Sequence, residues 1–182
     1  MEIRNVEIKL AITDAGAGRA SIQSVADGPP SILHQADTYF DTGGSSLLKL
    51  RRESVDGGAW RASLISYQRT LADAPEPSDI RLVQVEDGDG LVDLLSHALP
   101  VLAIVRKTRE LYFSGQTRIH LDDVERLGPF VELEVVLVEN QSEADGRRVA
   151  DRLLERLALC DAKPQRASYR DLLGAHARAA PA

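Results

Sequence analysis

Residues 107–135 carry charged side chains that alternate with apolar ones over three short segments. Successive side chains of a β-strand point to opposite faces, so each segment would have one charged and one apolar face. Ser114-Gly115 and Gly128-Pro129 are typical turn sequences between the segments. The pattern predicts three antiparallel strands with one shared charged face, made of Lys107, Arg109, Arg118, His120, Asp122, Glu132 and Glu134.

The same alternation recurs along most of the 182-residue chain. It predicts further strands at 3–12, 31–41, 47–52, 60–69 and 79–86, with a loop at 71–78. Apolar residues at helical spacing predict helices at 88–99, from Ser142 to about residue 160, and from Ser168. We therefore expect about eight strands and three or four helices in one domain over residues 1–175, followed by a frayed tail over 176–182.

Two architectures fit strands with one charged and one apolar face. One is an open sheet whose charged face meets water, as in an ordinary half-exposed sheet. The other is a closed barrel with a charged lumen and helices packed on its outer, apolar face. The predicted helices are amphipathic and need an apolar partner surface, which favours the second. We predict an α+β fold: an eight-stranded closed antiparallel β-barrel, or tunnel, with helices outside.

The predicted charged face is more basic than the chain as a whole. It holds seven bases and four acids, whereas the full chain has a net charge of −6. The bases are Lys9, Lys49, Arg51, Arg69, Lys107, Arg109 and Arg118, and the acids are Glu7, Asp122, Glu132 and Glu134. Converging bases suit a polyphosphate, and grouped acids suit Mg²⁺ or Mn²⁺. Each charged pair taken alone also fits a solvated strand face.

Several sequence segments, in order, resemble the CYTH family of triphosphate-tunnel metalloenzymes, which joins class IV adenylate cyclases and thiamine triphosphatases. The first is the E-x-E-x-K signature, matched at 5–9 by NVEIK, with Asn5 in place of the first Glu. The others are DTYF at 37–40, LKLRR at 48–52, LISYQR at 64–69, KTRELY at 107–112, RIHLDDVERLGPFVELE at 118–134 and SYRDLL at 168–173. The pieces at 64–69 and 118–124 are most similar to the class IV adenylate cyclase-like branch.

The resemblance implies a tunnel that binds a triphosphate together with Mg²⁺ or Mn²⁺. Carried onto matching positions, it makes Glu7, Glu132 and Glu134 metal ligands, with Asp122 as a possible fourth. It makes Glu7, Lys9, Glu132 and Glu134 the catalytic set. It assigns phosphate binding to Lys9, Lys49, Arg51, Arg69, Lys107, Arg109 and Arg118. Asn5 removes one negative charge from the signature, which places the metal affinity, or a second metal, in question.

Three functions remain open from the sequence. The first is an adenylate cyclase-like enzyme that converts ATP to cyclic AMP and pyrophosphate. The second is a hydrolase of inorganic tripolyphosphate or thiamine triphosphate, and the third is a non-catalytic polyanion-binding module. The sequence contains no P-loop, no Ser/His/Asp arrangement and no Cys/His metal spacing.

Partners and location are predicted from composition and length. The partner is a small molecule containing a triphosphate, since the acidic net charge disfavours binding of nucleic acid over the whole surface. No apolar run of about 20 residues predicts a membrane span, and no secretion signal is visible at the N-terminus. We therefore expect a cytoplasmic protein without membrane partners, and a homodimer is possible.

Overall fold

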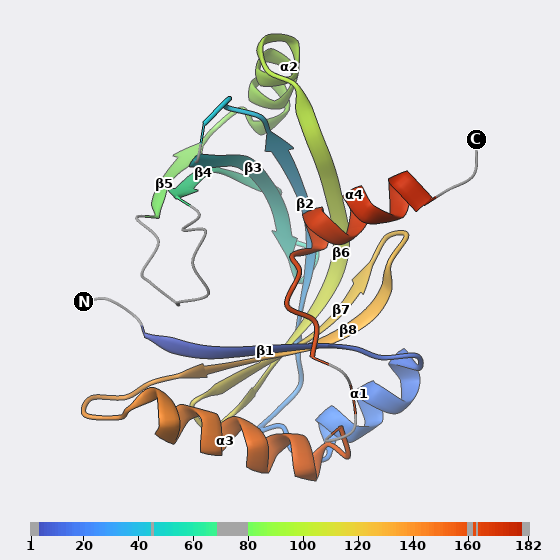
Figure 1. Ribbon diagram of the computed structural model, residues 1–182, viewed down its shortest axis with the longest axis vertical. Helices are drawn as coiled ribbons and strands as arrows, with labels where there is room; N and C mark the ends of the chain where they lie inside the picture. Colours follow the sequence, from blue (N-terminus) through green and yellow to red (C-terminus); the bar gives the residue numbers. More distant parts are fainter. Residues whose placement is uncertain (1–3, 45, 69–79, 160–161, 163, 180–182) are drawn as a thin grey trace. The chain divides into compact units, whose positions relative to one another are not determined.

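The computed structural model describes residues 4–44, 46–68, 80–159, 162 and 164–179. Within these ranges the chain forms eight strands and four helices (Figure 1). Their order is β1 (Asn5–Ala11), α1 (Ala15–Gln23), β2 (Ser31–Phe40), β3 (Ser46–Val55), β4 (Arg61–Gln68), β5 (Arg81–Val85), α2 (Gly88–Ala98), β6 (Val101–Ser114), β7 (Thr117–Val124), β8 (Gly128–Val136), α3 (Glu143–Arg156) and α4 (Tyr169–Ala179). Arg69 and the predicted loop at 71–78 lie outside the described residues.

The strands form one eight-stranded sheet in the order β1-β8-β7-β6-β2-β3-β4-β5. The pairs β1–β8, β7–β8, β3–β4 and β4–β5 are antiparallel. The β3–β4 hairpin turns at Asp56 and Gly57, both with positive φ (51° and 73°), which matches the predicted glycine turn. The predicted eight-stranded antiparallel sheet is therefore confirmed, while its closure into a tunnel stays a prediction.

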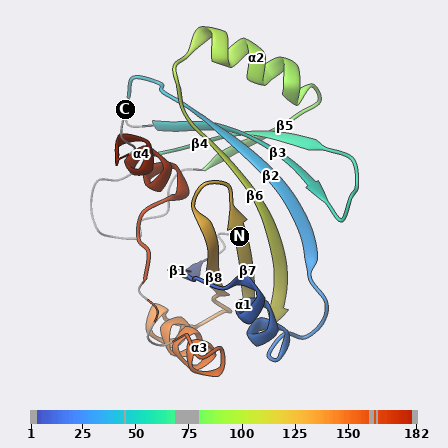
Figure 2. The ribbon, with the colours of Figure 1, turned by 90° about the vertical axis from the view of Figure 1, so that its right-hand side faces the viewer.

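The chain divides into two compact units, each built from two separate segments. The first unit contains Met1–Leu33 and Thr108–Ala167, and the second contains His34–Lys107 and Ser168–Ala182. Strand β6 is continuous (Figure 2) and contributes its earlier half to the second unit and its later half to the first. The charged residues of the predicted site therefore fall into two groups.

The first unit has its core on the uncharged face of β1, β7 and β8. Helix α3 contacts β1 and β8, and α1 contacts β7 and β8 (Figure 1). On the strands, the buried side chains of this core alternate with the charged positions: Ile119 and Leu121 of β7, and Val131, Leu133 and Val135 of β8. Leu153 of α3 and Leu157 at its C-cap pack against them. Burial of this apolar face is the main driving force for packing the helices. In this unit the helices cover the uncharged face, as predicted.

Helix α3 begins at a capping box and approaches the sheet at a glycine. The Ser142 hydroxyl accepts from the Asp145 backbone N–H, while the Asp145 carboxylate accepts from the Ser142 backbone N–H at 2.9 Å. One residue later, Gly146 faces β1. A Cβ atom at Gly146 would lie 2.8 Å from Val6 Cγ2 and 2.5 Å from Leu137 Cδ2. A residue with a Cβ atom therefore does not fit at position 146 while α3 stays this close to the sheet.

Gly146→Ala is expected to lower the free energy of unfolding by about 1–3 kcal/mol, because the added methyl group overpacks the α3–β1 contact. The loss should appear although alanine is the better helix former by about 1 kcal/mol. Urea unfolding of the purified variant measures it. Gly28→Ala is the matched control, since no atom lies within 4 Å of the added Cβ there. An unchanged or higher midpoint for Gly146→Ala would contradict the proposed close contact.

The second unit contains β3, β4, β5, α2 and α4, together with most of β2 and the earlier half of β6. Leu50 and Phe40 are fully buried in it, and α4 buries Tyr169 and Leu173. Helix α2 forms where the apolar spacing predicted it and contacts β3 and β4, but none of its residues is buried. The expectation that each amphipathic helix buries its apolar side therefore holds for α3 but not for α2. Helix α4 extends to Ala179, so residues 176–179 are helical, and 180–182 lie outside the described residues.

Candidate functional site

The charged face of the first unit consists of two rows that cross β1, β8 and β7. Antiparallel pairing sets the register of these strands and therefore decides which side chains lie opposite one another. The rows are Glu7–Glu134–Arg118 and Lys9–Glu132–His120. Each row places a carboxylate of β8 between residues of the two neighbouring strands. Six of the residues that alternate in the sequence are thus brought together by register.

Glu132 lies at the centre of one row and accepts contacts from two basic side chains. His120 Nδ1 lies 2.9 Å from Glu132 Oε1, and Arg109 Nη2 lies 3.4 Å from the same oxygen. Arg109 also donates to both oxygens of Asp122, at 2.6 Å each. Asp122 is completely buried, so this bidentate pair fixes the guanidinium group of Arg109 against β7.

Glu134 occupies the other row and has different partners. Arg118 Nη1 lies 3.2 Å from both of its carboxylate oxygens. The Asn5 amide donates to Glu134 Oε1 at 2.7 Å. Asn5 stands where the signature has a glutamate. Its amide stabilises the Glu134 carboxylate, which a glutamate at position 5 would repel.

The surroundings of Glu7 disfavour its ionised form. Partial desolvation by surrounding protein atoms, and the negative charges of Glu132 and Glu134, raise the pKa of Glu7. Lys9 and Arg109 oppose this shift. Glu7 is nevertheless exposed to solvent. A cation beside Glu7, Glu132 and Glu134 would relieve the repulsion that acts on Glu7, and the exposure of Glu7 gives a cation a route to this group.

The fit to a divalent metal ion differs among the four predicted ligands. Glu7, Glu132 and Glu134 supply the carboxylate oxygens that Mg²⁺ and Mn²⁺ prefer, and the repulsion of Glu7 by the other two fits a cation. Both oxygens of Asp122 are already taken by Arg109. In the described ranges, no three His, Cys, Asp or Glu side chains stand ready as a metal site. Metal binding would therefore require Glu132 or Glu134 to turn from its basic partners.

The second unit contains a separate basic cluster around a buried acid. Asp37 is 4% exposed and accepts from Lys49 at 2.9 Å and, through both oxygens, from Arg51 at 2.7 Å. Burial alone would raise the pKa of Asp37, but the hydrogen bonds and positive charges of Arg51 and Lys49 lower it to about 2. The Asp37 carboxylate thus holds both predicted phosphate-binding side chains in place.

Aromatic rings extend this second cluster toward α4. Lys49 Nζ lies 5.5 Å from the centroid of the Tyr39 ring, and the guanidinium carbon of Arg170 lies 5.9 Å from the same centroid. Lys107 Nζ lies 5.1 Å from the centroid of the Tyr169 ring. Cations at these distances are attracted by the faces of the rings. Arg170 therefore adds a fourth base to Lys49, Arg51 and Lys107.

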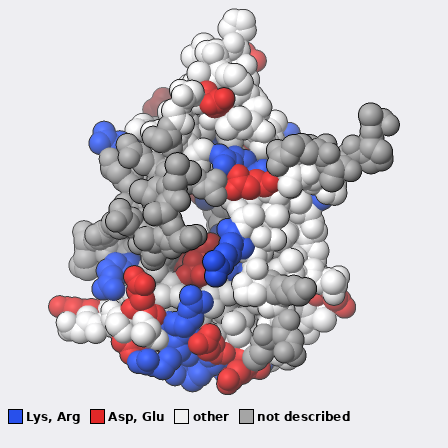
Figure 3. Space-filling view, in the orientation of Figure 1, with Lys and Arg blue, Asp and Glu red and all other residues white. Residues whose placement is uncertain are grey.

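Each unit brings together part of the predicted set. The first unit holds Glu7, Lys9, Arg109, Arg118, Asp122, Glu132 and Glu134, and the second holds Lys49, Arg51 and Lys107. Arg69 lies outside the described residues. In Figure 3, acidic and basic side chains lie beside one another at several places on the visible face.

Sequence reasoning did not assign Asp37 and Arg170 to the site. Asp37 carried a signal, because two neighbouring bases on one strand face require a counterion. Arg170 carried none, because it lies in a short helix far along the chain from the strands it meets.

The fold and these clusters define a class of protein: an antiparallel α+β protein whose strands carry paired carboxylates and bases. A family model described as the CYTH domain matches residues 4–169, and the chain belongs to this family. This confirms the resemblance inferred from the sequence. Among the described residues, no helix combines the length and the hydropathy needed to cross a membrane.

Three relatives illustrate the range of the family. The adenylate cyclase CyaB of Aeromonas hydrophila is 28% identical over 172 residues, covering 92% of this chain and 87% of that protein. A protein of Pyrococcus horikoshii OT3 has the same fold with a TM-score of 0.70 and 22% identity, over 93% of this chain and 99% of that one. A Hippeastrum protein described as a putative adenylyl cyclase with dominant triphosphatase activity has a TM-score of 0.63 and 15% identity, over 98% of both chains.

Proposed function

We propose that the protein is a divalent-metal-dependent enzyme that acts on a triphosphate. The favoured reaction is that of an adenylate cyclase-like enzyme, which converts ATP to cyclic AMP and pyrophosphate. The observation that carries the proposal is the strand register that brings Glu7, Glu132 and Glu134 together with Lys9 and Arg118. Desolvation and the charges of Glu132 and Glu134 raise the pKa of Glu7 in this group. The CyaB relative supports the choice of reaction.

The two charged clusters have different proposed roles. Glu7, Glu132 and Glu134 would hold Mg²⁺ or Mn²⁺, which supplies neutralisation of charge on phosphate oxygens. Lys9 and Arg118, in the same rows, would bind phosphate oxygens directly, as would Arg109, which Asp122 keeps oriented. In the second unit Lys49, Arg51 and Lys107 would bind phosphate oxygens, with Asp37 setting their geometry.

The proposed cyclase step conserves all atoms of ATP. The bond between the ribose 3′-oxygen and the α-phosphorus forms while the 3′-hydroxyl proton passes to water, and the bond between that phosphorus and the pyrophosphate oxygen breaks. The bases stabilise the negative charge that grows on the departing pyrophosphate. Preformed pairs such as Arg109–Asp122 hold their positions before the substrate arrives, which reduces the reorganisation that the step requires.

A triphosphatase is the second candidate function. It is favoured by the Hippeastrum neighbour, whose description reports dominant triphosphatase activity. In this second candidate function, water in place of the ribose hydroxyl would attack the terminal phosphorus of tripolyphosphate or thiamine triphosphate, and the remaining phosphate group would leave. A non-catalytic polyanion-binding module is the third candidate function. It is favoured because Asn5 replaces one acid of the signature and because its amide donates a hydrogen bond to the Glu134 carboxylate.

Product analysis distinguishes the three functions. The purified chain is incubated separately with ATP, tripolyphosphate and thiamine triphosphate, with Mg²⁺, with Mn²⁺ or with chelator, and products are resolved by ion exchange. We expect cyclic AMP and pyrophosphate from ATP, with none in chelator. Orthophosphate from tripolyphosphate or thiamine triphosphate, with ATP unchanged, would favour the hydrolase. No metal-dependent product from any substrate would contradict catalysis on these three triphosphates and favour the binding module.

A further inference from the structure

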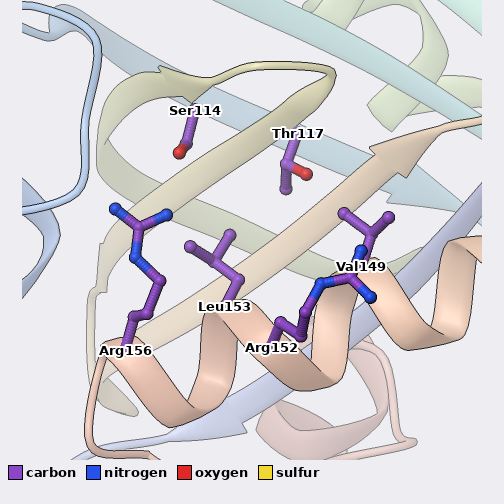
Figure 4. A pocket seen from close by; sticks show the side chains of 6 residues that line it. All are labelled: Ser114, Thr117, Val149, Arg152, Leu153 and Arg156. Carbon is purple, nitrogen blue, oxygen red and sulfur yellow. The ribbon is translucent and has the colours of Figure 1, made fainter.

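A cavity of about 280 Å³ lies in the first unit, between α3 and the end of the β6–β7 hairpin. It is lined by Val149, Arg152, Leu153 and Arg156 of α3 and by Ser114 and Thr117 of the hairpin (Figure 4). Val149 and Leu153 form an apolar floor, and the two arginines are exposed at its rim. Small-molecule sites commonly combine such an apolar lining with a few polar groups.

This cavity lies on the opposite face of the sheet from the carboxylates and bases described above. Thr117 alternates with Arg118 along β7, and Ser114 is an odd number of residues from Arg109 along β6, so their side chains point the other way. Helix α3, which supplies the remaining lining residues, packs on that uncharged face. A ligand bound there would be separated from the charged cluster by the sheet itself.

Among the residues that the structure describes, the two arginines have no acidic partner. Arg152 and Arg156 are one helical turn apart, a spacing at which like charges repel. Across the described ranges, neither one takes part in an ion pair or hydrogen bond. Arg148, one turn earlier on α3, differs because it pairs with Asp145. The rim therefore concentrates two uncompensated positive charges in a chain of net charge −6.

We propose that this cavity binds a phosphate-bearing small molecule whose apolar part lies on Val149 and Leu153. Guanidinium groups match the geometry of phosphate oxygens and bind them with charge-assisted hydrogen bonds. The Ser114 hydroxyl already donates to the Val25 carbonyl at 2.9 Å, so its oxygen accepts from a ligand hydroxyl rather than donating to phosphate. A nucleoside monophosphate combines three matching features: a phosphate, hydroxyl groups and a flat aromatic base whose faces can stack on apolar side chains.

Amide chemical shifts of the full chain, recorded by ¹H–¹⁵N NMR during titration, test this site separately from the proposed catalytic clusters. The probes are AMP, inorganic phosphate and adenosine, each up to about 10 mM, where a site of millimolar affinity fills. We expect AMP to shift the amides of Ser114, Thr117, Val149 and Leu153, with weaker binding of phosphate and of adenosine.

Variants assign the binding to the arginines. The double substitution Arg152→Gln and Arg156→Gln should weaken AMP binding at these amides by about tenfold or more, because both charged partners of the phosphate are lost. Arg148→Gln, the matched control on the same helix, should leave that affinity unchanged. Equal AMP binding by the double variant would overturn the proposal, as would the absence of shifts at these four amides.

The remaining outcomes also decide the proposal. Shifts confined to the amides of Lys49, Arg51 and their neighbours would overturn the proposed site in the cavity beside α3 and leave the proposed function standing. Equal binding of inorganic phosphate and AMP would overturn the role of the apolar floor. Shifts at the four amides in a chain that turns over no triphosphate would support this site while the proposed function fails.

Discussion

Glu132→Gln is expected to reduce turnover of the triphosphate substrate by about a hundredfold or more, while the protein remains folded. The substitution removes a negative charge from the group formed with Glu7 and Glu134, and effects of this size follow when one group acting on developing charge is lost. The glutamine oxygen still accepts from His120 and Arg109, so the row across β1, β8 and β7 retains its hydrogen bonds. Steady-state rates at saturating metal measure the loss.

Three measurements accompany this prediction. The midpoint of urea unfolding should change little, which separates a catalytic loss from unfolding. The pKa of Glu7, followed by NMR titration, should fall because one repelling carboxylate is neutral. Glu139→Gln is the matched control, as Glu139 is exposed beyond the end of β8. Near-normal turnover by folded Glu132→Gln protein would refute the assignment of Glu132 to the metal site.

Asp37→Asn is expected to lower the free energy of unfolding by about 2–3 kcal/mol. The carboxylate is buried and holds Lys49 and Arg51 together, and removing one partner of a buried ion group leaves the other charges uncompensated. The depression of its pKa to about 2 corresponds to roughly 2 kcal/mol at neutral pH. Lys49 and Arg51 should also lose their fixed positions, so the KM for a triphosphate should rise as well.

The stabilisation by Asp37 has a defined pH dependence. Its pKa is lower in the folded protein, about 2, than the ordinary value of 3.8, so the folded state favours the ionised form. Its contribution is complete above pH 3.8 and is lost as the pH falls toward 2. The difference in stability between the wild type and Asp37→Asn should therefore shrink across that window. Asp93→Asn, at an exposed position of α2, is the control, and its free energy of unfolding should equal that of the wild type across the same pH window.

The alternation of residues contained most of the information about the strands. Charged and apolar residues two apart predicted the faces of β7 and β8, since a strand has a period of two whatever its neighbours are. The glycine turns at Gly57 and Gly115 predicted the hairpins for an equally local reason, because those positions have a positive φ. The resemblance to the CYTH family added the order of the motifs, and the family model confirmed it.

Ion pairing within the site depended on information that the sequence does not carry locally. Glu132 and Arg109 were expected to serve a metal and a phosphate, yet they contact each other, and Arg109 is held by Asp122. Arg170 reaches the ring of Tyr39 although 131 positions separate them, a contact that no local pattern announces. Such contacts follow from register and packing between segments remote in sequence.

The strand faces, the turns, the amphipathic character of α3 and the residue types able to bind a metal and phosphates could all be predicted from the chain. These are local properties, fixed by backbone geometry and side-chain chemistry. Three features emerged from the folded arrangement alone: which charges neutralise one another, the organisation of Lys49 and Arg51 by Asp37, and the position of Arg152 and Arg156 beside a cavity on the uncharged face. Those features depend on distances between side chains of different elements, which exist only once the strands have paired and the helices have packed.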